Sequence, residues 1–108
     1  PDSQRFVLLM ARMIKEMFLQ QNAMDPVDAF STPAKQVAML RLLMHLFERG
    51  SQIIHQGAPI SSLQSRVTLW PQIVRSKSTV PNDDLSHFER LREQLDEQLD
   101  RLEKDYER

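Results

Sequence analysis

The 108-residue sequence has no cysteine and only two glycines, and each shortage excludes a class of site. Without cysteine the chain can form neither disulfides nor thiolate metal sites, which fits a reducing compartment. Two glycines cannot build a Gly-rich phosphate cradle, and the phosphate-binding pattern G-x-x-x-x-G-K-[ST] is absent. No apolar run is long enough to span a membrane, and no signal-peptide pattern opens the chain. We therefore expect one domain over residues 1–108 with a single modest core.

The composition that remains favours helices. Leucine, glutamine, methionine, arginine and glutamate are common, and runs of β-branched residues are missing. Charge is uneven: residues 1–77 carry nine Lys/Arg and five Asp/Glu (net +4), and residues 78–108 carry five and ten (net −5). The two parts could pair with each other or with separate partners, or could be solvated helix faces. No concentrated basic stripe exists, so nucleic-acid binding is not expected.

Apolar spacing predicts an all-α, multi-helix bundle whose first helix covers about residues 4–20, with Ser3 as its N-cap. This helix has an unusually wide apolar face, made by Phe6, Leu9, Met10, Met13, Ile14, Met17 and Phe18. We expect such a helix to pack on more than one side, against another domain or subunit of a longer protein. The start at Pro1, without an initiator methionine, also suggests a piece of a longer chain.

A long second helix is expected over about residues 33–56, capped by Thr32 and with Pro33 at its first position. Its apolar stripe is predicted to consist of Val37, Leu40, Leu43, Met44, Leu46, Phe47, Ile53 and Ile54. Because the stripe continues across Gly50, we expect one helix there and not two, at a cost of about 1 kcal/mol for the internal glycine. A break at Gly50 is the alternative, and Gly57 is expected to end the helix.

The remaining chain predicts short helices between residues 60 and 77, a linker over 76–81, and a second long helix over about 83–107. One short helix should follow Thr68, with Pro71 in its first turn and Trp70 in the core. The last helix has a single apolar stripe: Leu85, Phe88, Leu91, Leu95, Leu99, Leu102 and Tyr106. Opposite charges four residues apart are expected to pair along it: Arg92–Asp96, Glu97–Arg101 and Asp100–Lys104. Packing on the bundle is favoured over a coiled coil, since fewer than four heptads are present.

Residue types that usually carry chemistry are scattered. His45 and His55 are ten residues apart on one predicted helix, about 15 Å by helical rise, which is too far to share a metal. His87 is far from both in sequence and forms no metal-binding pattern with either. Asp25 and Asp28 flank Pro26 and resemble a carboxylate pair, but in a turn before a helix they more often bind backbone N–H groups. We therefore predict no catalytic residue and no metal site in this chain.

The stretch FLQQNAMDPVDAFSTP, residues 18–33, separates the two strongest helical patterns and resembles a known family. It is similar to the C-terminal region of the catalytic A subunit of V-type (vacuolar and archaeal-type) rotary ATPases and ATP synthases. That family has FLQQ, a small residue, an aromatic, acid-x-V-D, then aromatic-Cys-Pro entering a long helix. The matching positions are Phe18, Leu19, Gln20, Gln21, Asn22, Ala23, Val27, Asp28, Pro33, Lys35 and Gln36. The later Gly57-Ala58-Pro59 and the acidic last helix also resemble the family. After about residue 66 the resemblance is one of architecture only.

The resemblance implies a C-terminal helical domain cut from a subunit that binds ATP or ADP with Mg²⁺ elsewhere in its chain. The loop after FLQQ would border the adenine of the nucleotide, through Phe18, Gln20, Gln21, Ala23 and Met24. Its partners would be B subunits, central-stalk subunits and the subunit's own nucleotide-binding domain. The location would be cytoplasmic and peripheral to the membrane. The fragment alone should be inactive and bind no cofactor, because the phosphate-binding half is elsewhere.

The sequence departs from the family at two positions and leaves one alternative open. Met24 stands where the family usually has an aromatic residue, although a thioether can still pack on a ring. Thr32 stands where the family has Cys, and Thr is the better N-cap. The alternative function is a free-standing helical module for protein–protein interaction, whose last helix pairs with a partner helix.

Overall fold

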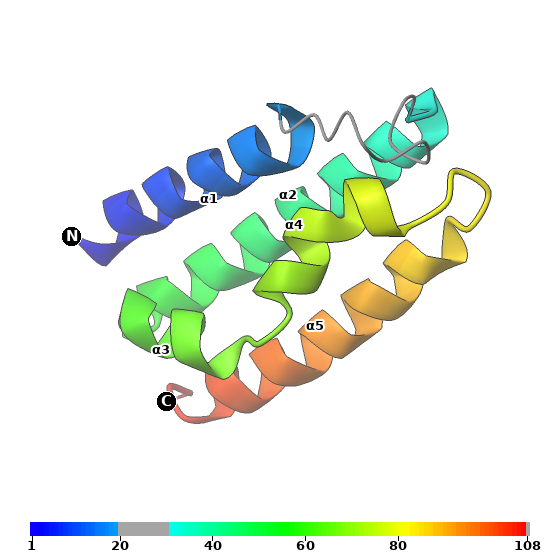
Figure 1. The fold of residues 1–108 in the computed structure, drawn as a ribbon. Coiled ribbons are helices and arrows are strands. Elements are labelled where there is room, and N and C mark those ends of the chain that lie inside the picture. The colour runs from blue at the N-terminus through cyan, green and yellow to red at the C-terminus, as the bar shows by residue number, and fades with distance from the viewer. Residues whose placement is uncertain (20–30, 108) are drawn as a thin grey trace.

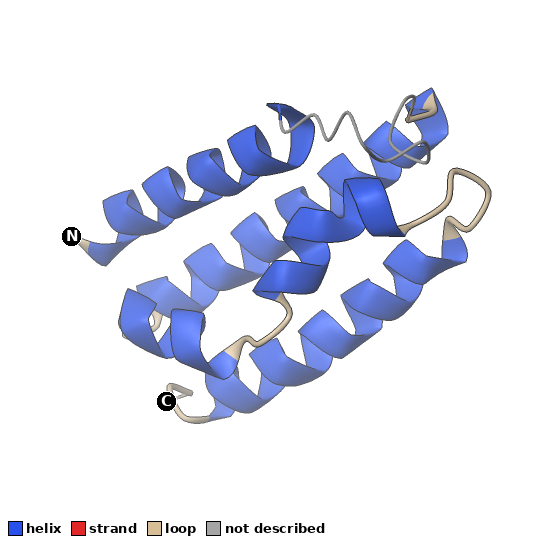
Figure 2. Ribbon diagram, viewed as in Figure 1, coloured by secondary structure: helices blue, strands red, loops and turns tan. Residues whose placement is uncertain are grey.

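The computed structural model describes residues 1–19 and 31–107 and is all-α over these ranges, as the sequence predicts (Figures 1 and 2). Its helices are α1 (Asp2–Leu19), α2 (Pro33–His55), α3 (Ile60–Arg66), α4 (Trp70–Thr79) and α5 (Ser86–Lys104). Helix α2 packs against α1 on one side and α5 on the other, and α4 packs against α1. The short α3 lies against both α1 and α5. The result is an elongated bundle of 47 × 25 × 20 Å.

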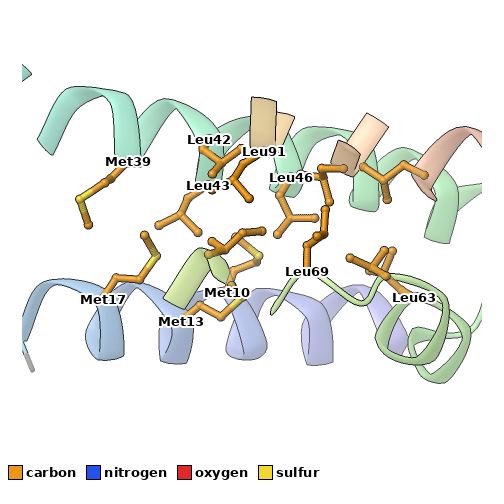
Figure 3. Packing of buried hydrophobic residues seen from close by; sticks show 14 of the residues in the cluster. Met10, Met13, Met17, Met39, Leu42, Leu43, Leu46, Leu63, Leu69 and Leu91 are labelled. Atoms are coloured by element: carbon orange, nitrogen blue, oxygen red, sulfur yellow. The ribbon is translucent and has the colours of Figure 1, made fainter. Parts of the chain in front are cut away.

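Methionine and leucine fill the space between α1 and α2 (Figure 3). Phe6, Met10, Met13 and Met17 lie on one face of α1 and are each at most 4% exposed. Opposite them α2 contributes Met39, Leu42, Leu43 and Leu46, and α5 contributes the leucines of its stripe. Unbranched methionine side chains adapt to gaps between helices, which suits a core with few aromatic residues.

Both ends of α2 form as the sequence predicts. The Thr32 side chain accepts a hydrogen bond from the Lys35 backbone N–H at 3.2 Å, and Pro33 follows in the first turn. The helix runs through Gly50 without a break and ends at His55. Gly57 then has a φ of +115°, a conformation that glycine adopts without the steric cost of a Cβ.

The second half of the chain corrects three boundaries. Helix α4 continues to Thr79, so the linker expected over 76–81 is wrong. Ser76 is buried, and its hydroxyl donates to the Ile73 carbonyl inside this helix. Helix α5 spans 86–104 and not 83–107, because residues 81–84 form a turn before it. Trp70 is only partly buried: its ring packs on the core while its Nε1 donates to the Gln64 carbonyl at 3.2 Å.

Two predicted apolar faces are wider than the core that covers them. Ile14 is 37% exposed and belongs to the wide face of α1 that we expect to pack on more than one side. Val37, Leu40 and Met44 of α2 are about half exposed, although they share the predicted stripe with the buried Leu43 and Leu46. The register explains this difference. The buried face of α2 runs through Met39, Leu42, Leu43 and Leu46, and Val37, Leu40 and Met44 lie outside the faces that meet the other described helices.

The basic front and the acidic tail pair with each other, one of the alternatives that the charge pattern left open. Arg49 of α2 donates to Asp96 at 2.9 Å and to Asp100 at 2.8 Å on α5, and His45 Nε2 lies 2.6 Å from the same Asp96 carboxylate. Arg66 pairs with Asp105 at 2.7 Å. Asp96 and Asp100 therefore bind α2, and not the neighbours along their own helix that the i, i+4 spacing suggested.

Candidate functional site

The candidate site is the segment between α1 and α2, and the structure describes its two flanks. Phe18, in the last turn of α1, is partly buried and packs against the core beside the fully buried Met17. The other four residues assigned to the adenine lie outside the described residues: Gln20, Gln21, Ala23 and Met24. The same is true of the Asp25 and Asp28 pair. Among the predicted site residues, only Phe18 can thus be located.

The second flank is tied to the turn that precedes α5. The Thr32 backbone N–H donates to the Asn82 side-chain oxygen at 3.2 Å, across fifty positions of sequence. The Gln36 side chain donates to the Ser31 carbonyl at 3.2 Å, which holds the residue just before the cap. These bonds and the Thr32 cap fix where the chain enters α2.

Lys35 is the residue that sequence reasoning underrated. It was named only as one of the matching positions, yet its side chain is fully buried, and its ammonium donates to the Lys77 carbonyl at 2.5 Å. Burial of a lysine is costly unless its ammonium is hydrogen-bonded, and this bond links the start of α2 to the end of α4. A signal was present: Lys35 shares the helical face of Met39, Leu42 and Leu46, which favours burial.

The three histidines either contact other side chains of the bundle or lie at its surface. His45 bonds to Asp96, the His87 ring meets the Phe88 ring edge-on at 6.4 Å, and His55 is exposed in the last turn of α2. Over residues 1–19 and 31–107, no three His, Cys, Asp or Glu side chains gather closely enough to hold a metal ion. None of the helices within those ranges is long and apolar enough to cross a membrane.

Comparison with known proteins gives a consistent result. Residues 1–64 match the family described as the C-terminal domain of V and A type ATP synthase. The V-type ATP synthase alpha chain of Halothermothrix orenii is 41% identical over 106 residues, which is 98% of this chain and 18% of that protein. The A subunit of the A-type ATP synthase of Metallosphaera sedula is 36% identical over 104 residues, with 96% and 18% covered. That of Saccharolobus islandicus is 38% identical over 105 residues, again with 96% and 18% covered.

These matches extend the resemblance beyond the densely matching stretch. The relatives align over nearly all of this chain, including the acidic last helix. The chain spans 18% of the length of each of these relatives, so it corresponds to one part of a much longer protein. The family match covers residues 1–64, and the relatives are more than 30% identical over nearly the whole chain. The chain therefore belongs to the C-terminal domain family of V and A type ATP synthases.

Proposed function

We propose that this chain is the C-terminal helical domain of the catalytic A subunit of a rotary ATP synthase or ATPase, where its α1–α2 loop borders the adenine end of the nucleotide. The observation that carries the proposal is the family match together with relatives named as the A subunit or the alpha chain of an ATP synthase. These names favour a part of an ATP synthase over a free-standing interaction module. The residues proposed at the adenine are Phe18, Gln20, Gln21, Ala23 and Met24.

The geometry of the flanks supports a binding role for the loop. Phe18 is only partly buried, so part of its ring is available for contact with a flat apolar base. At the other flank, Thr32 and Lys35 are bonded to Asn82 and Lys77, at the turn before α5 and the end of α4. A loop whose ends are held on a rigid scaffold can position side chains on a ligand at a low entropic cost.

Phosphoryl transfer would be performed by groups outside this chain. That chemistry depends on a phosphate cradle, Mg²⁺ and charge stabilisation of the transferring group. The chain lacks the phosphate-binding pattern, and its described residues hold no metal cluster. We therefore infer that the domain contributes to nucleotide affinity and to conformational coupling, and that the isolated chain neither hydrolyses ATP nor binds it tightly with Mg²⁺.

The partners we propose are the nucleotide-binding domain of the same polypeptide, adjacent B subunits and the central stalk, in a cytoplasmic sector peripheral to the membrane. Helix α1 has apolar side chains that a partner could cover, because Val7 is 50% exposed and Leu8 is 70% exposed on the side away from the core. A neighbouring polypeptide that covered these two adjacent side chains would remove their apolar surface from water. This chain matches 18% of each relative's length, and the other 82% includes polypeptide that could cover this face.

The test is a substitution of Met24 by Lys in the full-length protein within its assembled complex. If Met24 lies at the adenine, a charge there should raise the KM for ATP and the Kd for ADP about tenfold or more, since an apolar contact becomes a buried cation. Gln94→Lys, on the exposed face of α5, adds the same charge and should change neither constant. The 108-residue chain bearing Met24→Lys should keep its helical content and its stability. Unfolding of that chain would instead place Met24 in the core and overturn the assignment.

A further inference from the structure

A groove of about 560 Å³ lies between the first turns of α2 and the start of α5. Its apolar lining includes Val37 and Leu42 from α2 and Phe88 from α5. Leu42 and Phe88 are buried and form a firm floor, whereas Val37 is 47% exposed at the edge. A groove of this size between two rigid helices can receive the side chains of a partner without any rearrangement.

The groove continues into an apolar stripe on the outer face of α2. Val37, Leu40 and Met44 are three and four residues apart and are 47%, 46% and 55% exposed, so they form one continuous row about 10 Å long. Among the described residues, every large hydrophobic side chain with such exposure belongs to α1 or α2. This spacing is the one by which a helix packs against another helix.

The charged side chains that line the groove favour a partner with negative charge. Arg41 and Arg92 line it and are exposed, and neither makes an ion pair or hydrogen bond with the described part of the chain. Arg49, Arg66 and Arg90 are each paired with carboxylates of this chain, whereas Arg75 and Arg101 are also unpaired within the described residues but do not line the groove. Glu89 also lines the groove, so the rim carries a net positive charge from two arginines against one glutamate. Arginine and methionine beside an apolar floor are typical of protein interfaces.

We propose that the α2–α5 groove and the Val37–Leu40–Met44 stripe dock an amphipathic helix of another polypeptide, with an apolar row flanked by carboxylates. The partner's apolar side chains fill the groove and cover the stripe, and its carboxylates pair with Arg41 and Arg92. A second copy of this chain fits poorly. A two-fold contact through α2 would place Arg41 beside its own copy, and the leucines of the acidic α5 are already buried. The proposal does not depend on the adenine assignment.

The test uses the 108-residue chain and a synthetic helical probe. The probe is a peptide of about 18 residues, or about five helical turns, with leucines three and four apart and glutamates on both sides. Its matched control has glutamine in place of every glutamate. Binding is measured by calorimetry and mapped by amide chemical shifts. We expect the acidic probe to bind several-fold more tightly than its control, less so at high salt, with shifts at Val37, Arg41, Phe88 and Arg92.

Variants assign the binding to this surface. Replacing Arg41 and Arg92 together by Gln should weaken the acidic probe about fivefold, and leave the glutamine control peptide unaffected. Met44→Gln, at a half-exposed position, should weaken both peptides while preserving the fold. Arg75→Gln and Arg101→Gln, which remove exposed charges elsewhere, are the matched controls. Equal binding of the two peptides, shifts confined to α1, or self-association of the chain without the probe would each overturn the proposal.

Discussion

Replacement of Gly50 by Ala separates helix propensity from packing, because the two effects have opposite signs at this position. Gly50 lies in the interior of α2, five residues before its end, and is buried. A Cβ added there would lie 2.5 Å from the Phe6 Cζ and 2.8 Å from the Phe6 Cε2, both well inside van der Waals contact. The Phe6 ring cannot move away easily, since it is fully buried and stacked on Phe47, with ring centroids 5.7 Å apart and planes 6° from parallel.

The expected magnitude follows from two terms. Alanine favours a helix interior over glycine by about 1 kcal/mol, which would stabilise the variant. Overpacking a well-filled core typically costs about 1–3 kcal/mol, and a rigid stacked ring places Gly50→Ala near the upper end. The free energy of unfolding should therefore fall by about 1–2 kcal/mol, and each kcal/mol lowers Tm by roughly 4–8 °C in a chain of this size.

A double-mutant cycle with Phe6→Leu tests the cause, since leucine lacks the two ring atoms that the added methyl group would strike. In the Phe6→Leu background, Gly50→Ala should be neutral or stabilising by up to about 1 kcal/mol, and the coupling energy should be about 2 kcal/mol. Urea denaturation followed by circular dichroism gives all four free energies. Stabilisation by Gly50→Ala in the wild-type background, or a coupling below about 0.5 kcal/mol, would refute the close approach of α1 to α2.

Three further substitutions test the contacts that position the candidate loop and α5, each by urea denaturation. Thr32→Ala should lower the free energy of unfolding by about 1 kcal/mol through loss of the N-cap, and Thr32→Ser should not; equal losses would contradict the capping role. Lys35→Met should cost about 1–3 kcal/mol because the part-buried Lys77 carbonyl loses this donor, and an unchanged stability would argue against that bond. Arg49→Gln should cost about 1 kcal/mol at low salt and less at high salt, as its pair with Asp96 is partly exposed; a loss independent of salt would point to packing.

The helices could be predicted from local signals, and their surroundings could not. Thr32 and Pro33 mark the start of α2 through capping chemistry that needs no tertiary information, and the structure has the helix begin there. The end of α4 is a different case. Residues 76–81 contain serine, threonine and proline, which favour a linker, but burial of Ser76 against the core keeps the helix intact to Thr79.

The sequence did not show which apolar residues of α2 are exposed, for a related reason. Helical spacing places Val37, Leu40 and Met44 on an apolar row as regular as the buried one, and the sequence alone does not show which row the neighbouring helices cover. The candidate site shows the same limit. The resemblance to a known family assigned roles along FLQQ, but the burial of Lys35 depends on where α4 ends, a contact across 42 positions of sequence.

The candidate loop and the proposed docking groove share the first turns of α2, and this has a thermodynamic consequence. Thr32 and Lys35 anchor that helix start to the turn before α5 and to the end of α4, while Pro33 and Val37 of the same turns line the groove. A helix bound in the groove therefore contacts the same rigid unit from which the loop departs. If occupation of the groove changes the affinity of the full-length protein for ADP by some factor, ADP must change the affinity for the helix by that same factor. Titrating each in the presence of the other measures both factors, and factors of one would mean that the groove and the nucleotide site are not coupled.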